Sequence, residues 1–326
     1  MRRTDDSLKV VKEIPQSRDR INRNLLSGRL KLKATVEGGF LFVGTGRRTF
    51  SNLPKVKVGG RLLKQVVDEL CSKMGELVEE HASLDGRPVI PGSTLKGAVR
   101  SRVEHLFSPF NGSIQACYSV SRIRGMVRAS RMNARHLKRY GYEEYEGSIP
   151  ERERCNPPDR VCVVCDMFGA MSLASKVNFT DAVMEDGNYG SKRIRFNSKE
   201  GVYILVEEGS TFTFTVSFTN LTWEQLGLLF MGMRLHEGKP MLIGRFKYAA
   251  RKVDGEQTAF GRVKISLLEA YTYTCGKSGI PEEEEKDIEG LIGEAVKKAK
   301  EKFRLRELDE EEDDGEREKA RGSRGT

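Results

Sequence analysis

Two cations and a small hydroxyl residue open a helix directly after a proline–glycine turn. In the segment 90–100, IPGSTLKGAVR, the turn breaks a strand-like run, and Ser93 is the expected N-cap of the helix that follows. Lys96 and Arg100 are four residues apart, so helical spacing places them on one face. A helix N-terminus attracts anions because it carries unpaired N–H groups and a partial positive charge. We therefore expect Ser93, Lys96 and Arg100 to bind nucleic-acid phosphates; the alternative is an ordinary capped core helix.

Three of the six cysteines fall close together in the chain. Cys155, Cys162 and Cys165 combine a Cys-x-x-Cys pair with a third thiol seven residues upstream, a density typical of a tetrahedral zinc site. A closed structural site needs a fourth ligand, for which we expect His136 and keep Cys117 as the second candidate. Zinc would stabilise a charge-rich insertion that has few apolar residues of its own. Buried free thiols are the first alternative, and a redox pair is the second.

Basic residues gather in the segment 120–139, which contains seven lysines and arginines and no acidic residue. Helical spacing would place Arg124, Arg128 and Arg131 on one cationic face. Such a face suits the phosphates of RNA or an acidic partner, and the alternative is a solvated surface helix. Further candidates for RNA contact are Lys31, Lys33, Arg47, Arg48, Arg193, Arg245 and Lys247.

Strand and helix patterns are mixed irregularly along the rest of the chain. Apolar and polar residues alternate over 29–37 and 211–218, and a late strand is expected over 260–271. A capping-box pattern begins at Thr222 and predicts a helix. Another helical pattern surrounds Cys71, which we expect to be a small core residue. The order of these elements indicates a mixed α+β fold.

The composition favours a protein with a large core and a basic body that attracts polyanions, and charge alone does not distinguish nucleic acid from a membrane surface. The chain has 326 residues, 38% of them hydrophobic, and a net charge of +9. The last 51 residues carry 17 acidic and 12 basic side chains, so their charge of −5 leaves +14 on the rest. We expect 281–326 to be a charged, largely acidic tail, helical or disordered. Because no apolar stretch reaches membrane-spanning length and no signal-peptide core is present, we expect a cytoplasmic protein without a membrane partner.

The segment 90–100 closely resembles the signature of the RAMP superfamily, the RNA-binding subunits of CRISPR effector complexes. Two further segments agree with this resemblance. Residues 162–182 contain CVVCDMFG and VNFTDA, which resemble sequence motifs of the type III backbone subunits. Residues 207–212, EEGSTF, are similar to a segment that leads into a later core strand of those subunits. Length and motif order fit the subunit numbered three of Csm complexes, in the Cas-seven group.

The resemblance implies a ferredoxin-like or RNA-recognition-motif-like core over 1–280. The insertion 111–170 would form a helical, zinc-bearing lobe, and 181–200 would form a basic, thumb-like hairpin that kinks guide RNA. The implied function is a backbone subunit that binds single-stranded guide RNA, and with it target RNA, in a ribonucleoprotein for antiviral defence. Its implied partners are other CRISPR effector subunits and copies of itself along the RNA.

The segment 38–60 contains no Asp or Glu. In the slicing members of the resembled family, an aspartate at this place cuts target RNA with a divalent metal, so its absence argues against cleavage. Asp68 and Asp85 could replace the missing catalytic aspartate, but their spacing in the sequence does not support that role. Three alternatives stay open: an endoribonuclease that depends on Mg²⁺ or another divalent metal, a metal-independent ribonuclease that uses histidine, and an unrelated zinc-containing RNA-binding protein.

Overall fold

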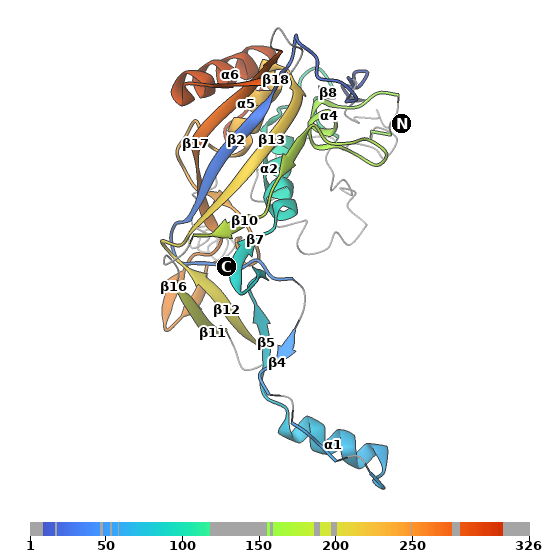
Figure 1. The fold of residues 1–326 in the computed structure, drawn as a ribbon, viewed down its shortest axis with the longest axis vertical. Helices are drawn as coiled ribbons and strands as arrows, with labels where there is room; N and C mark the ends of the chain where they lie inside the picture. The colour runs from blue at the N-terminus through green and yellow to red at the C-terminus, as the bar shows by residue number, and fades with distance from the viewer. Residues whose placement is uncertain are drawn as a thin grey trace, which may run out of the picture.

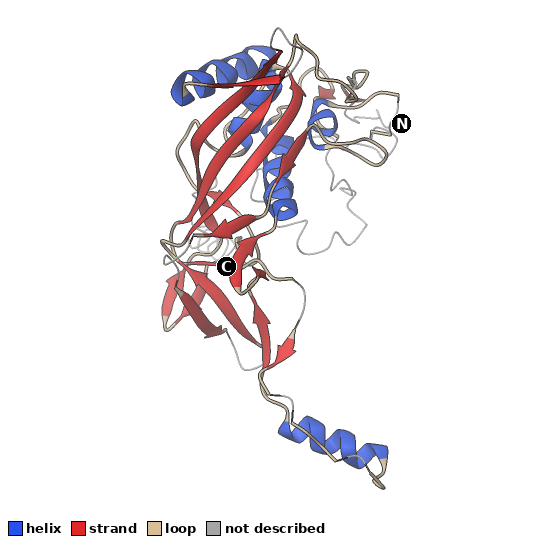
Figure 2. Cartoon of the chain, viewed as in Figure 1, coloured by secondary structure: helices blue, strands red, loops and turns tan. Residues whose placement is uncertain are grey.

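The computed structural model describes residues 9–308 except 17, 46–47, 53, 58, 118–154, 157–158, 186–189, 197–200, 249 and 276–280. Within this part, a large sheet carries helices on one face, a smaller sheet extends from one end of it, and one helix projects beyond the smaller sheet (Figures 1 and 2). Several residues singled out above lie outside the described residues, namely Arg47, Arg124, Arg128, Arg131 and His136.

The main sheet is antiparallel and is built around strand β2 (Leu26–Val36). This strand pairs on one side with β13 (Thr211–Leu221) and on the other with β17 (Arg262–Cys275). Alternation therefore predicts β2 and β13 correctly, and β17 coincides with the late strand expected over 260–271. The remaining strands of this nine-stranded sheet are β6 (Ser83–Leu84), β7 (Arg87–Ile90), β9 (Val177–Phe179), β10 (Ala182–Met184), β14 (Met241–Leu242) and β18 (Pro281–Glu285).

Helices α2 (Gly92–Leu106) and α5 (Trp223–Gly232) cover one face of the main sheet (Figure 1). Leu30 and Leu32 of β2 are fully buried in the core that these helices share with the sheet, whereas the side chain between them, Lys31, is exposed on the other face. In chain order β2, α2, β9 with β10, β13, α5 and β17 follow a β-α-β-β-α-β path. The helices in the described part of the chain are too short or too polar to cross a bilayer.

The cap of α5 agrees with the sequence. The hydroxyl of Thr222 accepts a hydrogen bond from the backbone N–H of Gln225, and the Gln225 side chain accepts one from the backbone N–H of Thr222. These two bonds satisfy two donors that a helix N-terminus otherwise leaves unpaired. The predicted capping box is confirmed.

The chain beyond residue 280 is helical over 288–302, in line with the helical form of the expected tail, but residues 281–308 are packed onto the rest of the protein. Strand β18 pairs with β17, and helix α6 (Ile288–Lys302) packs against α5 through the buried residues Leu291, Ala295 and Ala299. The helices approach so closely that an added Cβ at Gly227 of α5 would lie 2.0 Å from the carbonyl oxygen of Ala295. Residues 281–308 thus belong to the fold, because a narrow stripe of apolar residues is hidden among the charged residues of α6. Residues 309–326 lie outside the described part.

The smaller sheet has five strands and holds a second cluster of buried residues. Its hairpin begins at Ser191 rather than at residue 181, because the residues of β10 pair with β13 and β7 in the main sheet. The predicted hairpin 181–200 is therefore displaced along the chain. The strands of the smaller sheet are β3 (Phe40–Leu41), β4 (Thr49–Phe50), β5 (Leu77–Glu80), β11 (Ser191–Arg195) and β12 (Val202–Glu207).

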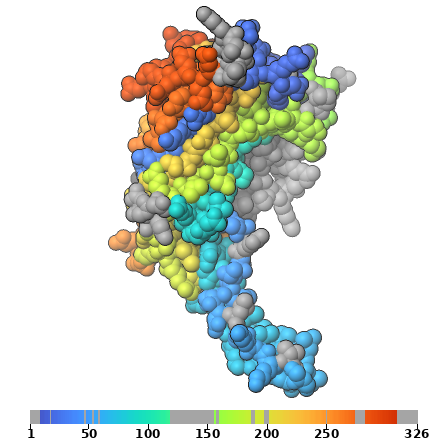
Figure 3. Space-filling view, in the orientation of Figure 1, coloured from blue at the N-terminus to red at the C-terminus, as the bar shows by residue number. Residues whose placement is uncertain are grey.

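Helix α1 (Leu63–Lys73) forms an arm between β4 and β5 that extends away from the body (Figure 3). Within the helix only Val66 is buried. Cys71, expected in the core, is exposed. That expectation is wrong because the apolar spacing of this helix does not face the core of the protein.

The N-terminal segment runs along the edge of the molecule beside the predicted metal-binding insertion. Strand β1 (Lys9–Val10) pairs with β8 (Ser113–Ile114) in parallel, and Glu13 forms a β-bridge with Val161. Two other elements complete the described structure, the short helix α4 (Val163–Phe168) and the hairpin of β15 (Arg251–Val253) and β16 (Glu256–Thr258).

Candidate functional site

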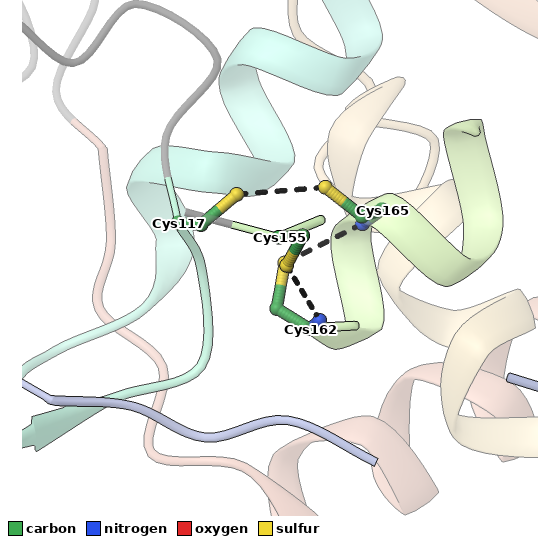
Figure 4. A group of neighbouring side chains, drawn as sticks. All are labelled: Cys117, Cys155, Cys162 and Cys165. Atoms are coloured by element: carbon green, nitrogen blue, oxygen red, sulfur yellow. Dashed lines mark hydrogen bonds between the residues drawn. The ribbon is translucent and has the colours of Figure 1, made fainter. Parts of the chain in front are cut away.

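Four cysteine side chains meet beside α2 (Figure 4). The sulfur atoms of Cys117, Cys155, Cys162 and Cys165 all lie within 4.8 Å of one another, close enough to hold a metal ion. The three cysteines of the predicted knuckle are thus brought together, and Cys117, the second candidate for the fourth ligand, joins them. His136 lies outside the described residues, so the structure does not compare it with Cys117.

Short backbone bonds position the sulfur atoms. Cys162 is the N-cap of α4, and its Sγ accepts a hydrogen bond from the N–H of Cys165 at 3.5 Å. The N–H of Cys162 in turn donates to Sγ of Cys155 at 3.0 Å. Cys117 arrives from the segment after β8, and its Sγ lies 3.5 Å from that of Cys165. The described parts of the insertion thus meet at the sulfur atoms, and their apolar side chains join the main core.

The donor set fits one tetrahedral metal ion. Four sulfur atoms bonded to a zinc ion at about 2.3 Å lie about 3.8 Å apart, which is similar to the spacing of these thiols. Without a cation, the shared hydrogen bonds lower the pKa of Cys117, because the other three thiols donate to its sulfur, and they raise the pKa of Cys162 and of Cys165. A divalent cation would allow all four to bind as thiolates. In the described part, no other group of three or more such side chains is placed to hold a metal.

Arg100 reaches the cysteine cluster from α2. Its Nη2 lies 3.4 Å from Sγ of Cys165, and its Nη1 donates to the carbonyl oxygen of Gly169 at 2.8 Å. Its Nε donates to Glu104 Oε1 at 2.9 Å. Burial opposes the charge of the guanidinium, yet Glu104 and the neighbouring sulfur atoms raise its pKa above the ordinary value. The sequence gives no sign of these contacts, since Arg100 and Cys165 are 65 residues apart.

The N-terminus of α2 is capped by a carboxylate from another segment. Pro91 takes the N-cap position, and Ser93 is an exposed residue inside the helix, so the predicted Ser93 cap is wrong. Asp181 Oδ1 instead accepts the N–H of Gly92 at 2.7 Å. A Cβ at Gly92 would lie 2.3 Å from the carbonyl oxygen of Phe179, which explains the glycine. Two of the motif segments identified in the sequence therefore contact each other here.

Lys96 and Lys33 are the candidate RNA contacts that have no ion-pair partner within the described residues. Both side chains belong to half-buried residues. Burial and the nearby charge of Arg100 lower the pKa of Lys96, so a bound anion would stabilise its charged form. Lys33 lies on the face of β2 that the helices leave open. These two lysines are available to phosphate in a way that the paired cations are not.

Two other candidate arginines share one buried carboxylate. Nε of Arg48 and Nη1 of Arg245 each lie 2.7 Å from an oxygen of Glu79, whose side chain is 7% exposed. The guanidinium of Arg245 also lies over the ring of Phe246, 4.9 Å from its centroid. Glu79 therefore fixes the orientation of both arginines and offsets part of their charge. Sequence reasoning missed Glu79 because it lies on a different strand.

The remaining described candidates are spread over separate patches. Lys31 pairs with Glu269 at 2.7 Å on the open face of the main sheet. Arg193 pairs with Glu76 at 2.9 Å at the edge of the smaller sheet. Nζ of Lys247 donates to the carbonyl oxygen of Leu242 at 3.4 Å. Among the described candidates, the structure thus groups Lys96 with Arg100, Arg48 with Arg245, and Lys31 with Lys33 on one face of β2.

A family model of the RAMP superfamily matches residues 39–322, a range that includes the cysteine cluster, α2 and the main sheet from α2 onward. The chain belongs to the RAMP superfamily. The RAMP superfamily is associated with CRISPR-related proteins that bind RNA. No curated protein matches the chain.

The carboxylates considered as catalytic substitutes lie apart in this RAMP chain. Asp68 is exposed on the arm α1, and Asp85 is exposed in the turn between β6 and β7, with a φ of +49°. Glu79, which pairs with two arginines, lies on β5, and β5 is the strand that pairs with β4. Glu79 is therefore the buried carboxylate nearest to β4 in the sheet. None of these three belongs to a group of metal-binding side chains within the described residues.

Two buried histidines of this RAMP chain, His81 and His105, contact backbone groups. Nδ1 of His81 accepts the N–H of Val43 at 3.2 Å, which leaves its Nε2–H to donate to the carbonyl oxygen of Val89 at 3.0 Å. His105 contacts the carbonyl oxygen of Ser101 through Nδ1 at 2.7 Å. Burial lowers the pKa of each histidine to about 4. Both are therefore neutral near pH 7 and bound to backbone.

We expect the free energy of unfolding to decrease as the pH falls from about 6.5 to about 4. In this window the unfolded chain binds a proton at each histidine, because the ordinary pKa is about 6.5, whereas the folded chain does not. Each site then contributes a slope of up to about 1.4 kcal/mol per pH unit. Urea unfolding at a series of pH values measures the slope. The His81→Gln variant should show a shallower slope, and an unchanged slope would contradict the assignment of His81.

Proposed function

We propose that this chain is a backbone subunit of a type III CRISPR ribonucleoprotein, similar to subunit three of Csm complexes. In this role it binds single-stranded guide RNA in the cytoplasm and polymerises along it beside copies of itself and other effector subunits, in antiviral defence. Membership of the RAMP superfamily supports the RNA-binding class. The observation that carries the site is Lys96, a half-buried cation on the family-like segment 90–100 with no carboxylate partner in the described structure.

The topology supports a ferredoxin-like core for this function. Strands β17, β2, β13 and β10 are neighbours in that order, and the connections through α2 and α5 follow the β-α-β-β-α-β path. The helices occupy one face, so the opposite face of the sheet is open to a partner. Lys33 lies at the centre of that face, on β2, where a phosphate backbone could pass.

We also propose that the four-cysteine cluster holds a structural zinc ion. Thiolate ligands select soft ions such as zinc, and four of them leave no open position for a reactive water. The ligands would be Cys117, Cys155, Cys162 and Cys165. A bound ion would tie the segment after α2 to the segment before β9, and thereby fix the insertion between them.

The first test is RNA binding by single lysine variants. We expect Lys96→Ala and Lys33→Ala each to weaken binding to single-stranded RNA of unrelated sequences alike. Each variant should reduce the slope of log affinity against log salt by about 0.7, since one phosphate contact releases about that many counterions from a single strand. Lys297→Ala is the matched control, because Lys297 lies on α6 with its side chain 76% exposed. Gel shifts with end-labelled RNA at several salt concentrations measure both quantities.

The same tubes also test the enzymatic alternative. Denaturing gels of the incubations with and without Mg²⁺ should show intact RNA in both. An unchanged salt slope in both lysine variants would contradict the proposed RNA path. Cleavage that requires Mg²⁺ would contradict the role as a subunit that binds without cutting.

A further inference from the structure

The sulfur atoms of the cysteine cluster accept hydrogen bonds from backbone N–H groups of the cysteines and also from a side chain outside the Cys-x-x-Cys segment. Backbone N–H groups of Cys162 and Cys165 point to the sulfur atoms of Cys155 and Cys162. For Cys165, the N–H donor is the guanidinium of Arg100, at 3.4 Å and from a different element. The backbone N–H of Cys155 serves the sulfur of Cys117 as well, so the donor to Cys165 stands out as a charged side chain.

Two hydrogen bonds hold the guanidinium of Arg100 in place. Glu104 accepts from Nε one helical turn further along α2, and its side chain is only 2% exposed. The carbonyl oxygen of Gly169, which ends α4, accepts from Nη1. These bonds leave Nη2 directed at Cys165. Because the donors of an arginine are fixed in one plane, two satisfied donors determine where the third points.

The position of the Arg100 guanidinium would compensate negative charge at the proposed metal site. Four thiolates around a divalent cation leave an excess of two negative charges in a buried place, and such a charge is costly unless it is compensated. Hydrogen bonds from neighbouring groups orient the atoms that bind the metal, and the loss of such a bond typically lowers metal affinity by about 10-fold to 100-fold. A guanidinium in contact with one sulfur atom provides both a donor and a positive charge.

We infer that Arg100 is a positioning residue of the metal site, which stabilises the Cys165 thiolate and orients it toward the ion, and is not a phosphate contact. This inference rests on the proposed metal site. The two cations of the segment 90–100 then have different tasks. Lys96, one turn earlier, contacts neither the cysteines nor a carboxylate in the described structure and stays available to RNA, whereas Arg100 joins α2 to the metal-binding insertion.

Metal affinity of the full-length chain tests the inference. Zn²⁺ is partitioned between the protein and a chromophoric chelator of known affinity. We expect Arg100→Gln to weaken zinc binding by about 10-fold to 100-fold. Arg100→Lys keeps the charge but loses the planar set of donors, so its affinity should fall between those of Arg100→Gln and the wild type. Lys96→Gln is the matched control from the same helix and should bind zinc as the wild type does.

A spectroscopic readout separates positioning from a general effect on folding. With Co²⁺ in place of zinc, the sulfur-to-metal charge-transfer band reports the energy of the sulfur lone pairs. Loss of the Nη2–H donor that Arg100 holds against Cys165 raises that energy, so we expect the band of Arg100→Gln and Arg100→Lys to move to longer wavelength while the tetrahedral d–d bands remain. Should Arg100→Gln not fold, the Arg100→Lys spectrum still decides.

Each outcome has a distinct meaning. Wild-type zinc affinity and an unshifted band in the Arg100 variants would overturn the inference but leave the metal site standing. A wild-type chain that takes up neither Zn²⁺ nor Co²⁺ would overturn both. If Arg100→Gln keeps its zinc affinity and instead lowers the salt slope of RNA binding, Arg100 is a phosphate contact.

Discussion

We expect the Cys165→Ser variant to lose stoichiometric zinc and to unfold at a temperature about 10 °C lower than the wild type. The Cys165 side chain is buried, 3.5 Å from the sulfur of Cys117 and 3.4 Å from Nη2 of Arg100. A hydroxyl in its place is a poor ligand for zinc, and the remaining three thiolates cannot close the site. Atomic absorption measures the zinc content, and circular dichroism follows thermal unfolding.

The matched control for this experiment is Cys71→Ser. Cys71 is an exposed free cysteine on the arm α1, so the same chemical change there should alter neither the zinc content nor the melting temperature. Full zinc content in Cys165→Ser would place the metal elsewhere in the chain. Loss of zinc without a change in melting temperature would show that the ion does not stabilise the fold.

The second large effect is expected at Asp166, the residue that follows Cys165. Its Oδ2 accepts from Nζ of Lys176 at 2.6 Å and from Nε2 of Gln225 at 2.8 Å, and its Oδ1 accepts from Nη2 of Arg18 at 3.0 Å. The Lys176 side chain is fully buried. Asp166→Ala would leave this lysine without its carboxylate, and the loss of one partner of a buried pair costs about 3–5 kcal/mol. Urea unfolding should show a decrease of this size.

Two comparisons sharpen this prediction. Glu283→Ala removes a carboxylate that pairs with Arg29 on the surface, where both side chains are at least 40% exposed, so it should cost less than about 1 kcal/mol. The double variant Asp166→Ala with Lys176→Met removes both buried charges and should recover most of the loss. If the double variant is no more stable than Asp166→Ala, the unpaired lysine is not the cause.

Local patterns in the sequence predict the centre of the fold well. Strand β2 and strand β13 each have one buried face, so alternation marks them, and the capping box at Thr222 is a local pattern that needs no distant partner. The Cys-x-x-Cys knuckle is equally local. These features depend on residues a few positions apart, which is the range that periodicity and spacing can detect.

Contacts between distant segments could not be predicted in this way. The carboxylate that caps α2 belongs to Asp181, 89 residues from Gly92, and Glu79 pairs with Arg245 across 166 residues. The same is true of the contact between Arg100 and the cysteines. Spacing indicates that a residue has the chemistry to bind a phosphate. It does not show that the same side chain already pairs with a buried carboxylate or a sulfur atom.

The order of strands in the main sheet has a consequence for synthesis. Lys31 of β2 pairs with Glu269 of β17, 238 residues later in the chain. During translation β2 leaves the ribosome long before the strand that completes one of its edges. Until then its apolar face and free backbone groups are exposed, a condition that slows folding and promotes aggregation. We therefore expect the yield of folded protein to depend on chaperones and on the speed of translation more than on the stability of the finished fold.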